Sequence, residues 1–532
     1  MYIGVAFSRF AGVCALVSIF GLNAVPVRAQ SQPPTAEQHQ HPAATPDQEQ
    51  EGHRMPMARD ASGTAWLPDT TPMHAIHRQR GPWQFMVHEN AFVQFLDDSG
   101  NRGHDQFGSI NWMMGMAQRN LGKGRVIFRG MFSAEPSTIR GCGYPDLLAS
   151  GERCKGEQIH DQQHPHDLAM EISAEYNAPL KGAIRWQVYG GPAGEPALGP
   201  VAYPHRVSAM PNPLAPISHH WLDATHIAFG VVTGGVYGGH WKAEGSIFNG
   251  REPDEIRTNI DFASLDSASG RVWFLPSPKW ALQVSIGRLT EAEPSQDSGP
   301  EIDVTRATAS ATYHSAFREN GVWATTLAWG RNSDPDHASN AFLLESNLTF
   351  DERDTWFGRF EVVGKSAHDL ALEDSADSFT VAKLQGGYTR YLKAWNHLQP
   401  GLGASFSAGV VPERLQPVYG SRVNLGFGVF LTLRPAAMMM AQSGTGAQDS
   451  PANITTPSAR PTGGAQPPAG QRMVMVQTAF DPAKLSCSPK IDPKDAAKTT
   501  YQGKTYYFCS VKERDEFLTD PAMSLSMMPP KQ

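Results

Sequence analysis

The chain has 532 residues, with 45 basic and 52 acidic side chains and a formal net charge of −7. Such a mild acidic excess excludes the strongly basic surface that nucleic acids require, so no nucleic-acid partner is expected. Of the five cysteines, Cys14 falls in the N-terminal segment, so the rest of the chain contains four.

Residues 1–29 are predicted to be a secretory signal peptide. Arg9 precedes an apolar stretch from Phe10 to Val25, and Val27-Arg28-Ala29 forms a small-x-small cleavage pattern. The alternative is a buried N-terminal helix. No later stretch reaches the roughly 18 apolar residues of a membrane-spanning helix. The mature protein is therefore expected to be exported, and either soluble or inserted in a membrane as strands.

Residues 30–80 are rich in proline, glutamine, histidine and methionine, a composition that predicts disorder. Thioethers select Cu(I), whereas imidazoles suit Cu(II) and zinc. The segment is therefore a candidate for loose metal scavenging, and an ordinary polar linker is the alternative. The candidate ligands are His39, His41, His53, Met55 and Met57.

Residues 81–435 alternate apolar and polar side chains with a period of two. Trp83, Phe85 and Val87 share one face near the start. Near the end, one face carries Val423, Leu425, Phe427, Val429, Leu431 and Leu433. Strands this long, apolar on one face, favour an all-β transmembrane antiparallel barrel of about 16 strands (about 14–18) over a soluble periplasmic β-structure. An even number of strands predicts that both termini lie in the periplasm of a diderm bacterium, with outer-membrane lipid around the barrel.

Two long insertions, 136–166 and 194–222, interrupt this pattern, and the densest groups of imidazoles and carboxylates lie in them and directly after them. These groups suit divalent transition metals, so we expect either a luminal metal site or a structural polar network. An enzymatic centre is the third alternative, but no catalytic motif is recognisable and no catalytic residue is assigned. The residues concerned are His160, Asp161, His164, His166, Asp167, His219, His220, Asp223 and His226.

Cys142 and Cys154 lie within the first insertion. In an oxidising compartment they are expected to form a disulfide, and a thiolate metal pair is the alternative.

Residues 436–475 have the composition of a flexible linker, and residues 476–532 form a separate module. The string from Tyr501 to Ser510, with Tyr506-Tyr507-Phe508-Cys509 at its end, resembles the YHS domain, a small treble-clef-like α+β module of proteins that handle copper and other heavy metals. This resemblance implies Cys487, Cys509 and Glu513 as ligands of copper or zinc. The chain departs from the family pattern at Ser488-Pro489, where a glycine and a methionine usually follow the first cysteine. A disulfide between the two cysteines is the alternative.

The middle region also resembles a family of exported bacterial proteins without an assigned reaction. The strings that carry this resemblance are Gly63 to Pro72, Gln163 to Asp167, Gly194 to Pro200 and Phe248 to Pro253.

These observations predict a non-enzymatic outer-membrane barrel with a periplasmic YHS module, acting in copper or heavy-metal homeostasis or efflux. Its expected partners are a transition-metal ion and periplasmic metal-efflux components. The alternative is a porin-like or structural barrel whose tail is a disulfide-stapled docking module without metal.

Overall fold

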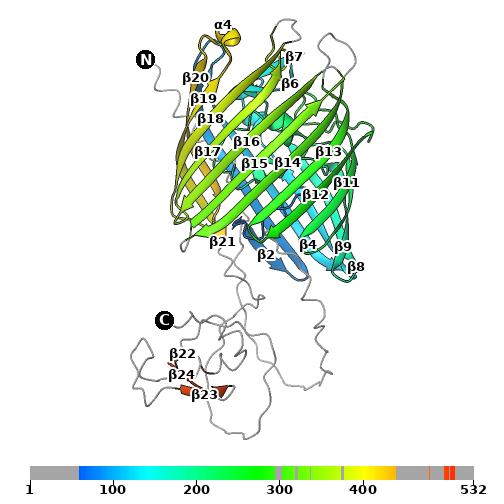
Figure 1. The fold of residues 1–532 in the computed structure, drawn as a ribbon, viewed down its shortest axis with the longest axis vertical. Coiled ribbons are helices and arrows are strands. Elements are labelled where there is room, and N and C mark those ends of the chain that lie inside the picture. The colour runs from blue at the N-terminus through cyan, green and yellow to red at the C-terminus, as the bar shows by residue number, and fades with distance from the viewer. Residues whose placement is uncertain are drawn as a thin grey trace, which may run out of the picture. The chain divides into compact units, whose positions relative to one another are not determined.

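The computed structural model describes residues 59–293, 302–317, 321–335, 337–372, 377–438, 478–479, 497–501, 504–509 and 514. Its main feature is a closed antiparallel barrel, in which 16 long strands are inclined to the barrel axis (Figure 1). The predicted barrel and its strand number are confirmed. Among the described residues, no helix is long and apolar enough to cross a membrane.

The 16 long strands are β3 (Trp83–Asp98), β4 (Asp105–Leu121), β5 (Gly124–Phe132), β8 (Ala169–Lys181), β9 (Ile184–Ala193), β10 (Val231–Tyr237), β11 (Trp241–Phe248), β12 (Ser267–Ser277), β13 (Trp280–Glu293), β14 (Ile302–Phe317), β15 (Gly321–Ser333), β16 (Ala338–Phe350), β17 (Asp354–Ser366), β18 (Ser378–Tyr391), β19 (Leu398–Val410) and β20 (Val423–Pro435).

The sheet closes where β20 pairs with β3, with Leu431 opposite Val93. The short strand β2 (Ile76–Arg80) pairs with the first part of β3, along the same edge, and so continues the position of β20. Next to it, β1 (Met73–His74) pairs with β21 (Ala437–Met438). Because both ends of the barrel sequence meet here, the sheet has no open edge to aggregate.

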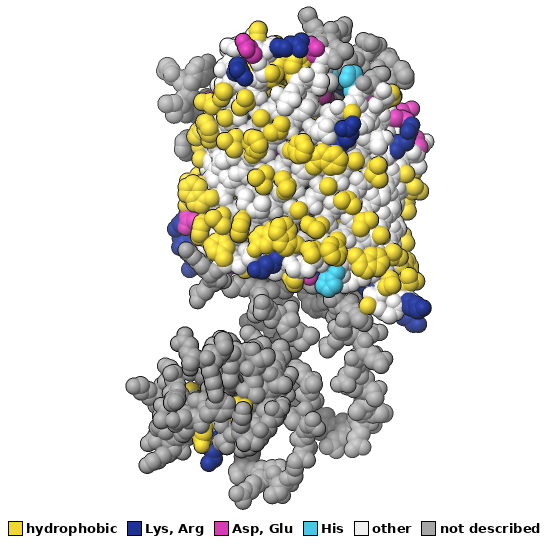
Figure 2. Space-filling model, viewed as in Figure 1, with side chains coloured by type: hydrophobic (Ala, Val, Ile, Leu, Met, Phe, Trp, Pro, Cys, Tyr) yellow, Lys and Arg dark blue, Asp and Glu magenta, His cyan; other side chains and the backbone are white. Residues whose placement is uncertain are grey.

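The outer wall of the barrel is apolar because alternate side chains of each strand point outward. On β20, Leu425, Phe427 and Val429 are exposed by 47%, 52% and 41%, whereas Gly426 and Gly428 between them are buried. Figure 2 shows hydrophobic side chains spread over the wall and charged side chains near its two rims. The wall therefore has the pattern of a surface that faces lipid.

The two ends of the barrel differ. Most connections at one end are tight turns, such as Gly122-Lys123 between β4 and β5 and Gly182-Ala183 between β8 and β9. Aromatic rings gather at that end, and Trp280, Tyr313 and Trp323 are in contact on neighbouring strands. The opposite end carries the long insertions.

Three insertions leave the barrel wall at the long-loop end, 133–168, 194–230 and 249–266. The first contains α2 (Glu135–Thr138) and the hairpin of β6 (Tyr144–Cys154) and β7 (Glu157–Gln163), and the second contains η3 (Tyr203–His205), α3 (His219–Leu222) and η4 (Ala224–His226). The third was not predicted, and the first two are longer than the sequence pattern indicated. The loop between β19 and β20 contains η5 (Glu413–Leu415) and α4 (Gln416–Tyr419).

Residues 59–80, which their composition assigned to a disordered segment, are structured. Trp66 is 1% exposed and packs against Tyr237 and Trp273 of the barrel interior. Composition suggested otherwise because the polar residues that surround this short apolar motif dominate the segment.

The C-terminal region contains a three-stranded sheet of β22 (Thr478–Ala479), β24 (Lys504–Phe508) and β23 (Ala497–Tyr501). Tyr506 and Phe508 are buried in it. The described residues of this region do not define a complete treble-clef module, so the YHS fold of the tail stays a prediction.

Candidate functional site

The barrel interior is occupied by the second insertion. Residues 193–209 and 211–219 are buried without interruption. The Arg206 guanidinium holds this insertion to the wall, because its Nε donates to Glu345 of β16 at 2.6 Å and its Nη1 donates to Asp223 at 2.7 Å. A second arginine, Arg359 of β17, donates to the other oxygen of the Glu345 carboxylate at 3.1 Å.

The N-terminal segment enters the lumen among the same side chains. The Ser62 hydroxyl donates to the carboxylate of Glu195 at 2.6 Å, and that carboxylate also accepts from Arg271 of β12. Burial raises the pKa of Glu195 to about 7, although Arg271 and Ser62 oppose the shift. Insertions and N-terminal segment together fill a lumen that in a barrel of this size would otherwise hold a wide aqueous channel.

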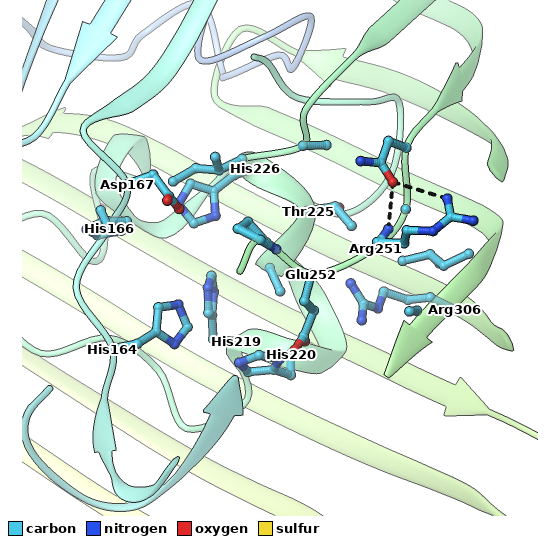
Figure 3. Close-up of a pocket in the computed structure, with 18 residues that line it drawn as sticks. His164, His166, Asp167, His219, His220, Thr225, His226, Arg251, Glu252 and Arg306 are labelled. Atoms are coloured by element: carbon cyan, nitrogen blue, oxygen red, sulfur yellow. Dashed lines mark hydrogen bonds and ion pairs between the residues drawn. The ribbon is translucent and has the colours of Figure 1, made fainter. Parts of the chain in front are cut away.

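Beside the buried second insertion lies a small cavity of about 30 Å³, enough for one or two water-sized occupants. All three insertions contribute to it, and β13 and β14 supply its outer wall. In Figure 3 the rings of His164, His219 and His220 lie together on one side and Arg306 on the other, with Glu252 between them. The polar side chains that line the cavity are His164, His166, Asp167, His219, His220, Thr225, His226, Asn249, Arg251, Glu252 and Arg306.

Short elements of the second insertion bring three of these histidines together. His219 and His220 begin α3, and His226 ends η4 one turn later. The ring centroids of His219 and His226 are 5.2 Å apart, and those of His219 and His220 are 5.5 Å apart. Each imidazole has an oxygen partner at 2.9 Å: Asp223 for His219, Glu252 for His220, and the backbone carbonyl of Asp223 for His226.

Burial keeps most of these imidazoles neutral. It lowers the pKa of His219 to about 4, against the opposing pull of Asp223, and it lowers the pKa values of His164 and His226 well below their usual value. A neutral imidazole has one nitrogen lone pair, which is the form that binds a metal.

His226 presents such a lone pair to the cavity most clearly. Its Nδ1 donates to the Asp223 carbonyl, which leaves the lone pair on Nε2, and that buried nitrogen has no hydrogen-bond partner among the described residues.

His166 has a different environment. Its backbone N–H and its Nδ1 both contact the buried Glu135 carboxylate of α2, at 2.9 and 3.0 Å. Burial opposes a charge on the ring, but the carboxylate outweighs that effect and raises the pKa of His166. Its Nε2 lies 3.0 Å from the Tyr203 hydroxyl. His166 therefore links the first two insertions as a structural polar contact.

Asp167 also faces the cavity. Burial raises its pKa to about 6, although Arg257 of the third insertion lies 3.5 Å away and opposes the shift.

The structure gathers most of the predicted luminal residues and separates two of them. Asp223 lies behind His219, whereas His160 and Asp161 pair with each other at 2.9 Å and with Arg102, away from the cavity. Within the described part of the chain, no three histidine, cysteine or acidic side chains already stand in the geometry of a bound metal ion.

The cysteines of the first insertion are joined. Cys142 and Cys154 form a disulfide, 12 residues apart in sequence. In the tail, Cys509 is disulfide-bonded. Cys487 and Glu513, together with His39, His41, His53, Met55 and Met57, lie outside the described residues.

Several residues of the site were not predicted from the sequence. Glu135 and Arg206 position the histidines from their own insertions, and Arg306 comes from the barrel wall. Glu252 and Asn249 belong to the string from Phe248 to Pro253, whose resemblance to exported proteins was the only sequence signal for the third insertion.

Comparisons with known proteins give only weak matches. No family model matches the sequence, and no curated protein matches it. Among solved structures, OmpF of Salmonella typhi in complex with daunomycin is 10% identical over 67% of this chain and all of its own, with a TM-score of 0.41. An anion-selective porin from Comamonas acidovorans is 9% identical over 67% of this chain and all of its own, with a TM-score of 0.40. The outer-membrane channel DcaP of Acinetobacter baumannii is 7% identical over 67% of this chain and 99% of its own, with a TM-score of 0.37. TM-scores this low do not establish a relationship to these proteins, so the barrel assignment depends on the strand register.

Proposed function

We propose that this protein is a non-enzymatic outer-membrane barrel that binds transition-metal ions, copper or zinc, inside its lumen. One observation carries the proposal: five imidazoles, from two insertions, line one small cavity within a filled barrel. Imidazole is the protein ligand best suited to both metals, and burial holds most of these rings in the neutral, binding form.

The outer wall supports the membrane assignment. Side chains such as Phe342, Leu384 and Phe427 are more than half exposed and apolar, as the lipid-facing band of an outer-membrane barrel must be. Outer-membrane barrels have short turns on the periplasmic side. The chain enters at β2 and leaves at β20 on the tight-turn end, so the proposal places both termini in the periplasm.

In that orientation, the tail and the N-terminal segment lie where periplasmic metal is available. The proposal therefore assigns Cys487, Cys509 and Glu513 of the YHS-like tail, together with the histidines and methionines of residues 30–58, to the collection of metal and its exchange with periplasmic efflux components. The tail cysteines bind metal only as reduced thiolates.

A specific observation favours a second candidate function. Because Cys509 is disulfide-bonded, it offers no thiolate in that state. In this alternative the tail is a disulfide-stapled docking module, and the barrel is porin-like or structural. Planar-bilayer conductance that is unchanged on deletion of residues 476–532, together with no metal sensitivity of the deletion strain, would support it.

The metal proposal is tested on the full mature protein in detergent, with the tail cysteines reduced, by elemental analysis and zinc titration. A Cβ added to Gly151 would lie 3.1 Å from Nδ1 of His164 and 3.2 Å from Nε2 of His220. We therefore expect Gly151→Ala to crowd the cavity and to weaken zinc binding by roughly tenfold or more.

Gly234→Ala is the matched control, since its added methyl group meets nothing within 4 Å. A wild-type protein that binds neither copper nor zinc above background refutes the metal proposal.

A further inference from the structure

A second group of soft side chains lies inside the barrel, separate from the cavity. It combines two imidazoles with thioethers, and none of the thioethers is more than 3% exposed. Trp112 packs against both imidazoles, with ring centroids 5.0 Å from His88 and 4.6 Å from His205. The members of this group, called here the His-Met cluster, are His88, Met114, Met131, Met170 and His205.

The strand register builds most of this cluster at one level of the wall. His88 of β3 is directly opposite Met114 of β4, and Met114 is directly opposite Met131 of β5. Directly opposite residues point to the same face of a sheet. All three point inward, because Val87, Phe128 and Phe132, on alternate positions, are the exposed residues. His205 reaches the same level from the second insertion.

The atoms that would bind a metal are already adjacent. Nε2 of His88 lies 3.1 Å from Sδ of Met114, and Nε2 of His205 lies 3.3 Å from Sδ of Met131. The two imidazole rings are 5.2 Å apart between centroids. Nitrogen and sulfur ligands of one tetrahedral ion, at about 2.0 and 2.3 Å from it, stand about 3.5 Å apart. Each of the two pairs is therefore within a few tenths of an ångström of the separation of two ligands of one ion.

Packing alone is a weaker explanation of the His-Met cluster than metal binding. Thioethers often fill gaps beside aromatic rings, but the inner face of a membrane barrel is usually polar. Here three inward methionines, Met114, Met116 and Met131, lie on two adjacent strands beside two histidines. Thioether sulfur is a weak hydrogen-bond acceptor, so it compensates little of the desolvation cost of an imidazole N–H that is buried against it.

The same pattern repeats one level nearer the tight-turn end. His77 of β2 is opposite Met86 of β3, and Met86 is opposite Met116 of β4. In the other direction, Met131 and Met170 pack in one cluster with Ile227, which lines the cavity. Histidines and methionines thus extend from the tight-turn end of the wall to the cavity.

We propose that His88, Met114, Met131 and His205 form a binding site for a soft monovalent cation, Cu(I), within the barrel. Thioether and neutral imidazole together select Cu(I) over Zn(II), which prefers nitrogen, oxygen and thiolate ligands. Met170 and the Trp112 ring complete a dry, polarisable environment around a cation. The inference rests on the proposed function, since it requires metal to reach the lumen, and it adds the identity of the ion and its ligands.

The test measures Cu(I) affinity of the full mature chain by competition with a chromogenic Cu(I) chelator. The variant is Met114→Leu with Met131→Leu, because leucine keeps the volume of methionine and removes the sulfur. We expect its Cu(I) affinity to fall by more than the roughly 10–100-fold that loss of an outer partner costs, while its zinc affinity stays unchanged. Met113→Leu is the matched control, because Met113 alternates with Met114 and is opposite the exposed Phe132.

Heat-modifiable gel migration checks that each variant folds, and the single variant Met114→Leu replaces the double variant if that one does not. X-ray absorption of the Cu(I)-loaded wild type supplies a second readout, with sulfur scatterers expected that diminish in the variant. Wild-type Cu(I) affinity in the leucine variants, or unchanged sulfur scattering, overturns the inference. If those variants bind normally while Gly151→Ala weakens zinc binding, only the inference fails; if the wild type binds no metal, the proposed function fails with it.

Discussion

Replacing Arg206 with methionine should release the second insertion from the barrel wall. The guanidinium is fully buried and donates three hydrogen bonds, to Glu345 at 2.6 Å, to Asp223 at 2.7 Å and to the Val201 carbonyl at 2.9 Å. Methionine fills a similar volume without charge, so the two carboxylates lose their shared partner.

The size of the effect follows from what those carboxylates retain. Removing one partner of a buried ion pair costs about 3–5 kcal/mol. Glu345 keeps Arg359 at 3.1 Å, and Asp223 keeps the Nδ1 of His219 at 2.9 Å. Since neither carboxylate becomes fully unpaired, we expect the lower end, about 3 kcal/mol. That changes the ratio of docked to undocked insertion by roughly two orders of magnitude.

Planar-bilayer conductance and limited proteolysis of residues 194–230 measure this change. The variant should open larger or more frequent conductance steps than the wild type, and its insertion should be cut faster. Arg288→Met is the matched control: Arg288 is 68% exposed and paired with Asp303 outside the lumen, so no measurable change is expected. An Arg206→Met barrel that conducts as little as the wild type and resists protease equally well would refute the view that this network holds the second insertion in the lumen.

Three further outcomes are expected. The pKa of His219 is about 4 in the folded state against 6.5 in the unfolded state, so its neutral form contributes stability above pH 6.5 that is lost as the pH falls towards 4, roughly 3 kcal/mol in all. His219→Asn should therefore keep the insertion protected from protease at lower pH than the wild type. Coincident pH profiles of protease protection would contradict this. Reduction of the Cys142–Cys154 disulfide, or Cys142→Ser with Cys154→Ser, should destabilise the β6–β7 hairpin by about 3 kcal/mol and speed its proteolysis without unfolding the barrel. Val429→Arg, on the outer face midway along β20, should lower the folding stability in lipid by about 2–4 kcal/mol and reduce the heat-modifiable folded band. Trp395→Arg should leave that band intact, because Trp395 is 77% exposed in the connection between β18 and β19 at the tight-turn end.

The sequence by itself determined the barrel. Side chains that alternate with a period of two over ten or more residues fix which face meets lipid, and a register slip of one residue would reverse every face. Strand β20 shows this directly, since every residue that lies between its exposed apolar residues is buried. These exposed residues are Val423, Leu425, Phe427, Val429 and Leu431. The strand number followed from counting such segments and the turn residues between them.

The contents of the lumen were only partly predictable. The histidines were recognised because they are dense in sequence, and most of them do meet in one cavity. His160 and Asp161 belong to the same dense string but lie elsewhere, because the β6–β7 hairpin carries them towards Arg102. Sequence density gives no information about how a loop of about 35 residues folds back.

Only the tertiary structure decided which side chains meet across long distances in the chain. Arg206 and Glu345 are 139 residues apart in sequence, and their contact decides that the barrel is filled. His88, Met114, Met131 and His205 are each unremarkable in the sequence, where a lone methionine inside a strand usually indicates packing. They become one candidate site because antiparallel pairing places residues of three strands at one level of the wall, and the second insertion supplies the fourth.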